Sequence, residues 1–538
     1  FELLQRGETT GIFQLESRGM RDYLKQLVPN DFEDIVSMNA LYRPGALGMN
    51  MVDSYINRKH GKEDVTYGHE AVEKILSTTY GVIVYQEQVM QIAQELSGFS
   101  LGQADILRRA MGKKKKEEME SLRSTFVDGA VKKDVNERYA ANLFDQIEQF
   151  AGYGFNRSHS VGYALIAYQT AWLKAHFPAE FMASVLSCDL GNTDNIQLFV
   201  DDCRNIGLSV LSPDINISTY RFEDLDSKTI LYGLGAIKGI GSSLVEEILS
   251  VRKNEKFKDI NDFCMRVGFN RINKRILTTL IGSGAMDSLG KREDLFRRID
   301  SCLKNAEQAS ERNKSNIKDL FGEEIIAPKE DEINTDIEFD EVSAEWSALG
   351  FYLDSHPLEN KKKEVRNMCG FFISELQSES HTQRIAGCLM QFNVRQGKRG
   401  RFAFATLDDG SAKIEISIWA DVFEKYRNLL KKGQVLVVEG MIEKDDYSDS
   451  AKYKMIAERI LTFDQARYEY IKNIKIDIGD SPEEAQALVN SIKEIANSSD
   501  GNPILISYKG NSAKADIALP SNYSVKINDS SIKALDKR

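Results

Sequence analysis

The 538-residue sequence lacks the features that mark several classes of protein. Its six cysteines are scattered with no Cys-x-x-Cys pair, which argues against a metal site and indicates reduced, cytoplasmic thiols. No run of about 18 apolar residues occurs, so no membrane-spanning helix is predicted. The chain starts at Phe1 without a basic-then-apolar leader, and we expect a fragment whose N-terminal part is missing.

A general excess of basic residues is also absent. The net charge is −11, and taken alone this argues against a nucleic-acid-binding protein, which usually has a basic footprint. Cations are instead concentrated locally, in the runs 113–116 and 396–401. A lysine run alone is more often a solvated helix end, so these runs do not decide the function. With 42% hydrophobic residues over this length, several globular domains are expected.

Two segments suit a ligand with several negative charges and a flat ring. Six cations fall within nine residues, from Arg108 to Lys116, and a turn rich in aromatics and glycine follows at 150–160. A triphosphate needs several fixed cations, because its charge must be compensated where water is scarce. A nucleobase needs a flat surface for its ring to lie against. The two segments together predict a nucleotide site.

These segments have a specific resemblance. The runs are ILRRAMGKKKK (106–116) and FAGYGFNRSHS (150–160), with IFQLESRGM (12–20), ALYRPG (40–45) and TYGVIVYQEQ (79–88) upstream and YQTAWLKAH (168–176) and GLGAIKGIG (233–241) downstream. In this order they resemble the C family of DNA polymerases, the bacterial DNA polymerase III alpha subunits. The resemblance covers nearly the whole chain. It implies template-directed addition of deoxynucleotides to a primer 3′ end by a DNA-directed DNA polymerase, a nucleotidyltransferase.

The resemblance also implies which residues contact ligands. Those expected to bind the nucleotide are Arg108, Arg109, Lys113, Lys114, Lys115, Tyr153, Asn156, Ser158 and His159. Arginine suits phosphates because its planar fork bonds two oxygens at once. The residues expected to bind DNA are Arg18, Arg43, Lys238, Gly239, Gly241, Arg395, Lys398, Arg399, Arg401 and Phe402.

The metal-binding carboxylates of such an enzyme are not found. Nucleotidyl transfer uses two divalent metals, and in the family three palm aspartates hold two Mg²⁺ ions. No Asp-x-Asp in an apolar strand occurs near the N-terminus. We therefore expect no catalytic residue and no metal ligand in this chain, with the aspartates upstream of Phe1. The fragment alone is predicted to bind DNA without extending a primer.

The predicted fold is multidomain and mainly α, followed by an OB β-barrel and a small α/β domain. The expected order is the end of the palm or the palm–fingers junction (1–20), fingers (21–210), tandem helix-hairpin-helix units (211–300), a linker (301–378), an OB barrel (379–465) and a C-terminal domain (466–538). The barrel follows from alternating strands at 402–407, 414–419 and 434–440. Such barrels bind single strands on aromatic residues in a basic groove.

Partners follow from the resemblance as well. They are primer–template DNA, single-stranded template and dNTP, with a clamp-loader subunit at the C-terminal domain. A proofreading exonuclease would bind the missing N-terminal region. In the polar linker, Leu320 and Phe321 match a short peptide that binds the sliding clamp, although Ile317 stands where the family has glutamine.

Two alternatives stay open at this stage. An error-prone paralogue of alpha usually lacks the final loader-contacting domain, and residues 466–538 argue against it. A non-catalytic DNA-binding adaptor of hairpin-helix units and an OB barrel would account for 211–465, but not for the arginine pair or the tyrosine–histidine turn. Competitive dNTP binding separates these alternatives.

Overall fold

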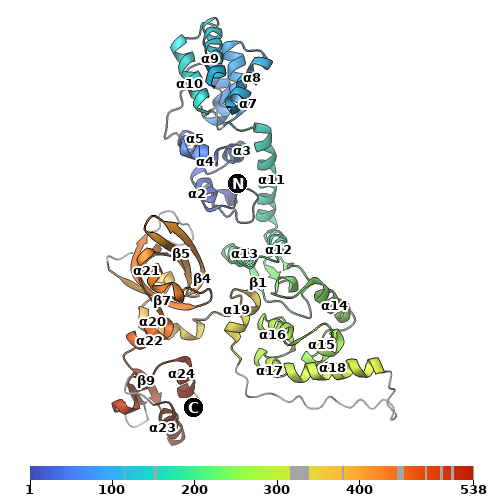
Figure 1. Ribbon diagram of the computed structural model, residues 1–538, viewed down its shortest axis with the longest axis vertical. Coiled ribbons are helices and arrows are strands. Elements are labelled where there is room, and N and C mark those ends of the chain that lie inside the picture. Colours follow the sequence, from blue (N-terminus) through green and yellow to red (C-terminus); the bar gives the residue numbers. More distant parts are fainter. Residues whose placement is uncertain are drawn as a thin grey trace. The chain divides into compact units, whose positions relative to one another are not determined.

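The computed structural model describes residues 1–113, 116–150, 154–315, 339–377, 381–444, 453–478, 481–496, 501–509 and 514–536. Within this part the chain forms two compact units, whose helices and strands are labelled in Figure 1. The first consists of Phe1–Leu211 with Arg221–Gly233, and the second of Ser212–Tyr220 with Leu234–Arg538. Each unit is described by itself.

The first unit begins with short helices packed against one long helix. They are α1 (Glu2–Gln5), α2 (Arg18–Leu27), α3 (Phe32–Leu41), α4 (Pro44–Gly48) and α5 (Met51–Lys59), and the long helix is α11 (Arg157–His176). Small side chains of α11, namely Ala164, Ala167 and Ala171, lie in the core that these helices share. Because alanine is short, α11 approaches α3 closely, and the Ser160 hydroxyl donates to the Val36 carbonyl at 2.5 Å.

A second core in this unit is formed by α6 (Glu70–Leu76), α7 (Gln86–Ser97), α8 (Leu101–Lys113), α9 (Lys116–Val131) and α10 (Glu137–Phe150). Helices α7 to α10 cluster together in Figure 1. In the sequence, Val89, Ile92, Ala93 and Leu96 recur at helical spacing and predict a helix there, which α7 confirms. Helix α7 ends where Gly98 takes a φ of +70°. Ala104, Leu107 and Ala110 bury one face of α8 at spacings of three residues. The opposite face of α8 is thereby left to solvent.

The rest of the first unit consists of α12 (Pro178–Cys188), α13 (Thr193–Asn205) and a sheet in the order β1-β3-β2. Its strands are β1 (Ser209–Leu211), β2 (Glu223–Asp226) and β3 (Thr229–Leu231). A buried ion pair fixes the end of α11 to α13: Nζ of Lys174 lies 2.7 Å from Oδ2 of Asp202 and donates to the Thr10 carbonyl at 2.8 Å.

The second unit starts with a helical part, formed by α14 (Ser242–Arg252), α15 (Ile260–Val267), α16 (Lys274–Gly282), α17 (Arg292–Arg297) and α18 (Ile299–Ser315). The range 301–378, assigned to a linker, contains much of α18 together with α19 (Glu341–Leu349) and α20 (Lys362–Cys369). The carboxylate of Glu345 on α19 is buried and accepts N–H bonds from Leu353 and Asp354 at 2.7 and 2.8 Å. Part of this range is therefore packed structure.

A closed five-stranded barrel follows in the order β4-β5-β6-β8-β7. Its strands are β4 (Gln383–Gly397), β5 (Gly400–Asp408), β6 (Lys413–Ile418), β7 (Val435–Lys444) and β8 (Tyr453–Thr462), with α21 (Ala420–Tyr426) beside them. All neighbours are antiparallel except β6 and β8, which are parallel. Ala403, Ala405 and Leu407 of β5 point into the core, so the residues between them face outward. The predicted barrel is confirmed.

The chain continues through α22 (Phe463–Tyr470) into a small α/β part with β9 (Ile474–Ile478), α23 (Pro482–Ile495), β10 (Ile504–Lys509), β11 (Lys514–Ala518) and α24 (Asp529–Asp536). Strand β10 is central, parallel to β9 and antiparallel to β11. The predicted fold class, mainly helical with a barrel and a small α/β end, is confirmed. Among the residues described, no helix is both long and apolar enough to cross a bilayer.

Candidate nucleotide and nucleic-acid sites

The arginines predicted to bind phosphates lie on the exposed face of α8 and share one carboxylate. Arg108 donates from Nε and Nη2 to Oδ1 of Asp105 at 2.9 and 2.8 Å. Nε of Arg109 lies 2.8 Å from Oδ2 of Asp105. The hydrogen bonds from Arg108 hold the pKa of the Asp105 carboxyl below its usual value. The carboxylate is therefore ionised at neutral pH.

The second predicted segment, from Gly154 onward, pairs with the extended residues that precede α7. The N–H of Gln86 donates to the Phe155 carbonyl at 2.9 Å, and the N–H of Phe155 donates to the Val84 carbonyl at 3.3 Å. A Cβ on Gly154 would lie 2.9 Å from Cε1 of Phe150 and 3.0 Å from Cγ of Gln86. Glycine therefore lets this turn approach the start of α7.

Gln86 joins the two predicted segments. Its Nε2 donates to the Gly154 carbonyl at 2.9 Å, and its Oε1 accepts a long hydrogen bond, 3.5 Å, from Nη1 of Arg108. The arginine pair and the glycine turn are far apart in the sequence, yet one glutamine side chain contacts both. The structure thus brings together the two segments that the sequence analysis assigned to one ligand.

The first turn of α11 carries Ser158 and His159, both exposed. Asn156 caps this helix: its Oδ1 accepts from the His159 N–H at 2.9 Å, and its Nδ2 donates to Oε1 of Glu87 at 2.7 Å. The other oxygen of Glu87 accepts from the Arg157 N–H at 3.0 Å. Both the Oδ1 and the Nδ2 of Asn156 are hydrogen-bonded within the protein, so this side chain positions the start of α11.

A row of rings extends from this turn. The guanidinium of Arg43 lies 4.2 Å from the centre of the Phe155 ring, Phe155 lies 5.4 Å from His159, and His159 lies 4.4 Å from Tyr163. Burial lowers the pKa of Arg43. Arg43 and His159 both lie against the Phe155 ring and so share one surface. Arg18 is exposed at the first position of α2.

Several predicted residues have no described position. Lys114, Lys115 and Tyr153, and the linker residues Leu320 and Phe321, lie outside the described residues. Lys113 is the last residue of α8, and its side chain is likewise not described.

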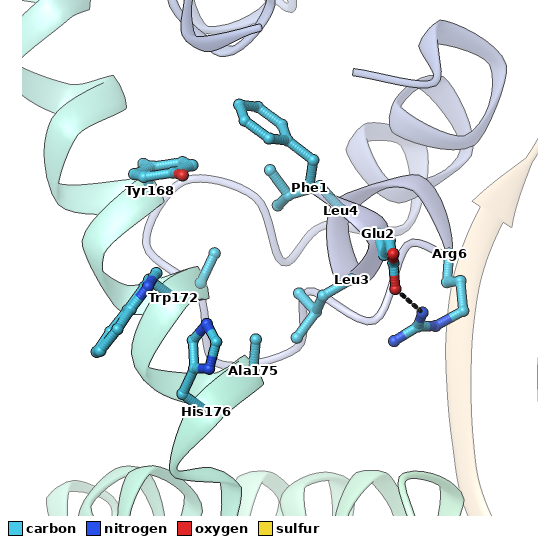
Figure 2. Close-up of a pocket in the computed structure, with 10 residues that line it drawn as sticks. Phe1, Glu2, Leu3, Leu4, Arg6, Tyr168, Trp172, Ala175 and His176 are labelled. Carbon is cyan, nitrogen blue, oxygen red and sulfur yellow. Dashed lines mark ion pairs between the residues drawn. The ribbon is translucent and has the colours of Figure 1, made fainter. Parts of the chain in front are cut away.

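A pocket of about 480 Å³ lies elsewhere in the first unit, between α1 and α11 (Figure 2). Tyr168, Trp172 and His176 come from α11, and the Trp172 and His176 ring centres are 4.5 Å apart. On the α1 side of the pocket, Nη1 of Arg6 lies 3.9 Å from Oε2 of Glu2. None of the described residues predicted to bind a nucleotide lines this pocket.

In the second unit, the glycine hairpin before α14 has open backbone. Gly239 has a φ of +76°, which favours glycine, and nothing lies within 4 Å of a Cβ built on Gly239 or Gly241. Gly241 is the N-cap of α14, and Lys238 beside it is exposed. A helix N-terminus is suited to a phosphate oxygen, and the two glycines leave space beside it.

The barrel carries an aromatic cluster on its outer face. Phe402 and Phe404 alternate with inward residues of β5, and the Phe402 ring centre lies 5.6 Å from Phe404 and 5.5 Å from Trp419. Trp419 is 49% exposed. The guanidinium of Arg395 lies 5.5 Å from the Phe404 ring centre. Phe402 and Arg395 thus lie on one surface, as a stacking platform requires.

The remaining predicted cations of the barrel lie at the β4–β5 turn. Lys398 and Arg399 are exposed there. Nη2 of Arg401 lies 2.9 Å from Oε1 of Glu424, an exposed ion pair that solvent and salt weaken.

The described residues do not fit a metal site. No three histidine, cysteine, aspartate or glutamate side chains of the described ranges come close enough together to hold an ion.

Three family models match the chain. Residues 1–134 match the bacterial DNA polymerase III alpha subunit finger domain. Residues 207–296 match a helix-hairpin-helix motif, and residues 384–462 match an OB-fold nucleic acid binding domain. The three matches follow one another along the chain without overlap.

Two DNA polymerase III alpha subunits are similar to nearly the whole chain. DNA polymerase III subunit alpha of Escherichia coli (strain K12) is 43% identical over 512 residues, which cover 92% of this chain and 44% of that protein. The corresponding protein of Pseudomonas aeruginosa is 40% identical over 565 residues, covering 99% of this chain and 48% of that protein. The chain belongs to the family of DNA polymerase III alpha subunits, and it spans less than half the length of these relatives.

A solved structure of a replication protein A heterotrimer bound to ssDNA is also similar, with a TM-score of 0.16 and 14% identity over 28% of this chain and 36% of that one. A likeness this slight carries no argument about the fold or the function.

Sequence reasoning missed Gln86, Glu87 and Asp105 as parts of the site. Asp105 lies three and four residues before the arginines, a spacing that places it on their face of a helix. That signal was available. The contacts of Gln86 and Glu87 depend on tertiary pairing of α7 with a distant turn, for which a single sequence holds no signal.

Proposed function

We propose that this chain supplies the nucleotide-binding and DNA-binding parts of a replicative DNA polymerase III alpha subunit, which adds deoxynucleotides to a primer 3′ end. The observation that carries the proposal is the Gln86 bridge, which places the arginine pair of α8 beside the turn that leads into α11. The phosphates and the base of one dNTP need both features within the length of that single molecule. Membership of the family supports the same assignment.

Within this proposal, Arg108 and Arg109 bind the phosphates of the incoming nucleotide, with Lys113, Lys114 and Lys115 adding positive potential. Ser158, His159 and Tyr153 lie around the base pair and sugar. Asn156 acts through the helix start that it caps, because both of its polar ends are already engaged.

The DNA would be held by three separate surfaces. Arg43 and Arg18 contact the template or its phosphates near the fingers. Lys238, Gly239 and Gly241 take a duplex phosphate at the start of α14. The barrel holds single-stranded template through Phe402, Arg395 and the cations Lys398, Arg399 and Arg401.

The metal chemistry belongs to other residues in this proposal. In the whole protein, two Mg²⁺ ions held by palm aspartates would activate the primer hydroxyl and stabilise the leaving pyrophosphate. The residues described here bind and orient the nucleotide and the DNA. We therefore expect this chain alone to bind DNA and dNTP and not to extend a primer.

Calorimetric titration of the chain with dATP, and separately with primer–template DNA, tests the assignment. Arg108→Ala removes a charge-assisted contact worth about 1.5–3 kcal/mol and should weaken dATP binding by roughly 10- to 100-fold. Arg123→Ala is the matched control, because Arg123 also pairs with an aspartate, Asp145, at 2.8 Å in the same helical cluster, and it is not among the residues assigned to the nucleotide. An equal fall in DNA affinity would show that Arg108 holds DNA rather than the nucleotide.

Further partners are proposed from the family. The sliding clamp would bind Leu320 and Phe321, and a clamp-loader subunit would bind the C-terminal domain. A proofreading exonuclease would bind a part of the whole protein that lies outside this chain. In a full-length protein, changing Leu320 and Phe321 to alanine should abolish clamp-stimulated synthesis and leave clamp-free synthesis intact. Unchanged clamp binding by the double variant would move that contact elsewhere.

A further inference from the structure

Asp105 holds both of the arginines that the proposed function assigns to phosphates. One carboxylate oxygen accepts from Arg108 and the other lies against Arg109, at 2.8–2.9 Å. A phosphate group bound by the same two guanidiniums would offer two oxygens in a similar way. The carboxylate therefore stands where a phosphate would be recognised, and it carries the same sign of charge.

The three side chains remain accessible to a ligand. The exposed fraction is 30% for Asp105, 35% for Arg108 and 67% for Arg109. Ion pairs at such exposure are weak and exchange readily. A ligand with more negative charge than one carboxylate can displace Asp105 from the arginines, whereas a weakly charged anion cannot do so as easily.

We propose that Asp105 is a specificity-determining residue that competes with the ligand's phosphates for Arg108 and Arg109. The inference rests on the proposed nucleotide site and extends it. Asp105 neutralises part of the charge of the arginine pair before a ligand binds, so that only a polyanion such as a triphosphate is held. The same competition favours release of a less charged product.

Competition should outweigh the ordering that Asp105 gives to the arginines. Arg108 keeps a second contact, to Gln86, when Asp105 is changed. An exposed pair supplies little ordering, whereas a full negative charge within a few ångströms of a triphosphate opposes each of its charges. Removing the charge of Asp105 should therefore strengthen polyanion binding.

Titration of the chain with dATP and with inorganic triphosphate tests this. Asp105→Asn should tighten the binding of both ligands by roughly two- to tenfold, the range for one or two exposed ion pairs. Asp105→Ala should do the same, because alanine is the best helix former and leaves α8 intact. Asp105→Glu keeps the charge and should bind with nearly unchanged affinity.

Asp145→Asn is the matched control, since Asp145 pairs with Arg123 at 2.8 Å on neighbouring helices. It should leave both affinities unchanged. Weaker or unchanged binding in Asp105→Asn and Asp105→Ala, with helical circular dichroism retained, would overturn the competition and leave Asp105 as a residue that only orders the arginines. Failure of the nucleotide site itself gives a different result: Arg108→Ala would then leave dATP binding unaltered.

Discussion

Gln86 should set how well the arginine pair and the α11 turn act on one ligand. Changing Gln86 to alanine removes the 2.9 Å hydrogen bond to the Gly154 carbonyl and the 3.5 Å contact with Arg108. The shorter bond is neutral and partly buried, which corresponds to about 0.5–1.5 kcal/mol, and the longer one adds little. The backbone bonds between Gln86, Phe155 and Val84 remain, so the turn stays attached.

The expected result is therefore a partial loss of affinity. Binding of dATP should weaken by roughly two- to tenfold, because about 1.4 kcal/mol corresponds to a factor of ten. Calorimetric titration of the chain with dATP measures it. The midpoint of thermal unfolding should fall by only a few degrees, since the core of α7 is formed by other residues, among them Val89 and Ile92.

Gln91→Ala is the control for helix and composition. Gln91 lies on the same helix, is exposed, and its variant should bind dATP as the unaltered chain does. An unchanged dATP affinity in Gln86→Ala would refute the view that this side chain couples the two segments. Weakening by more than about a hundredfold would show that the backbone pairing does not hold the turn alone.

Three further predictions concern other parts of the chain. Lys174→Met leaves the Asp202 carboxylate buried without its cation and should lower the free energy of unfolding of the first unit by about 3–5 kcal/mol in urea denaturation, while the exposed Lys74→Met changes it little. Replacing the barrel cations Lys398, Arg399 and Arg401 with alanine should weaken single-strand binding. It should also reduce the slope of log affinity against log salt by about 0.7 for each phosphate that the protein no longer neutralises. An unaltered slope would show that these cations are ordinary surface residues. Burial lowers the pKa of His356, so the folded protein favours the neutral ring. The contribution of this ring to the free energy of unfolding is complete above about pH 6.5 and is lost as pH falls below that value. His356→Gln should reduce this pH dependence, measured by urea titrations between about pH 5 and 7.

The elements with strong local patterns could be predicted from the sequence. Alternation at 402–407 and 414–419 predicted strands that the barrel contains, and helical spacing at 89–96 predicted most of α7. The arginine pair and the histidine turn were chosen by residue type and by resemblance. Their assignment to a ligand stays a prediction.

What the sequence could not show depends on contacts between distant segments. The approach of Gly154 to Gln86, and of Arg43 to Phe155, is set by packing of several helices, which no local pattern encodes. Asn156 illustrates a different limit. Its residue type suits both ligand contact and helix capping, and only its partners show that it caps α11.

The anchoring of α11 has a mechanical consequence. This helix has 20 residues, a length of about 30 Å, with Asn156 capping its first turn and Lys174 buried in its last. An unbroken helix transmits a displacement at one end to the other as a stiff rod. A tilt of about 5° about the Lys174 end would move His159 by roughly 2 Å, close to the difference between a hydrogen bond and none. The placement of a side chain at the nucleotide site is thus set partly by a buried ion pair at the far end of the same helix.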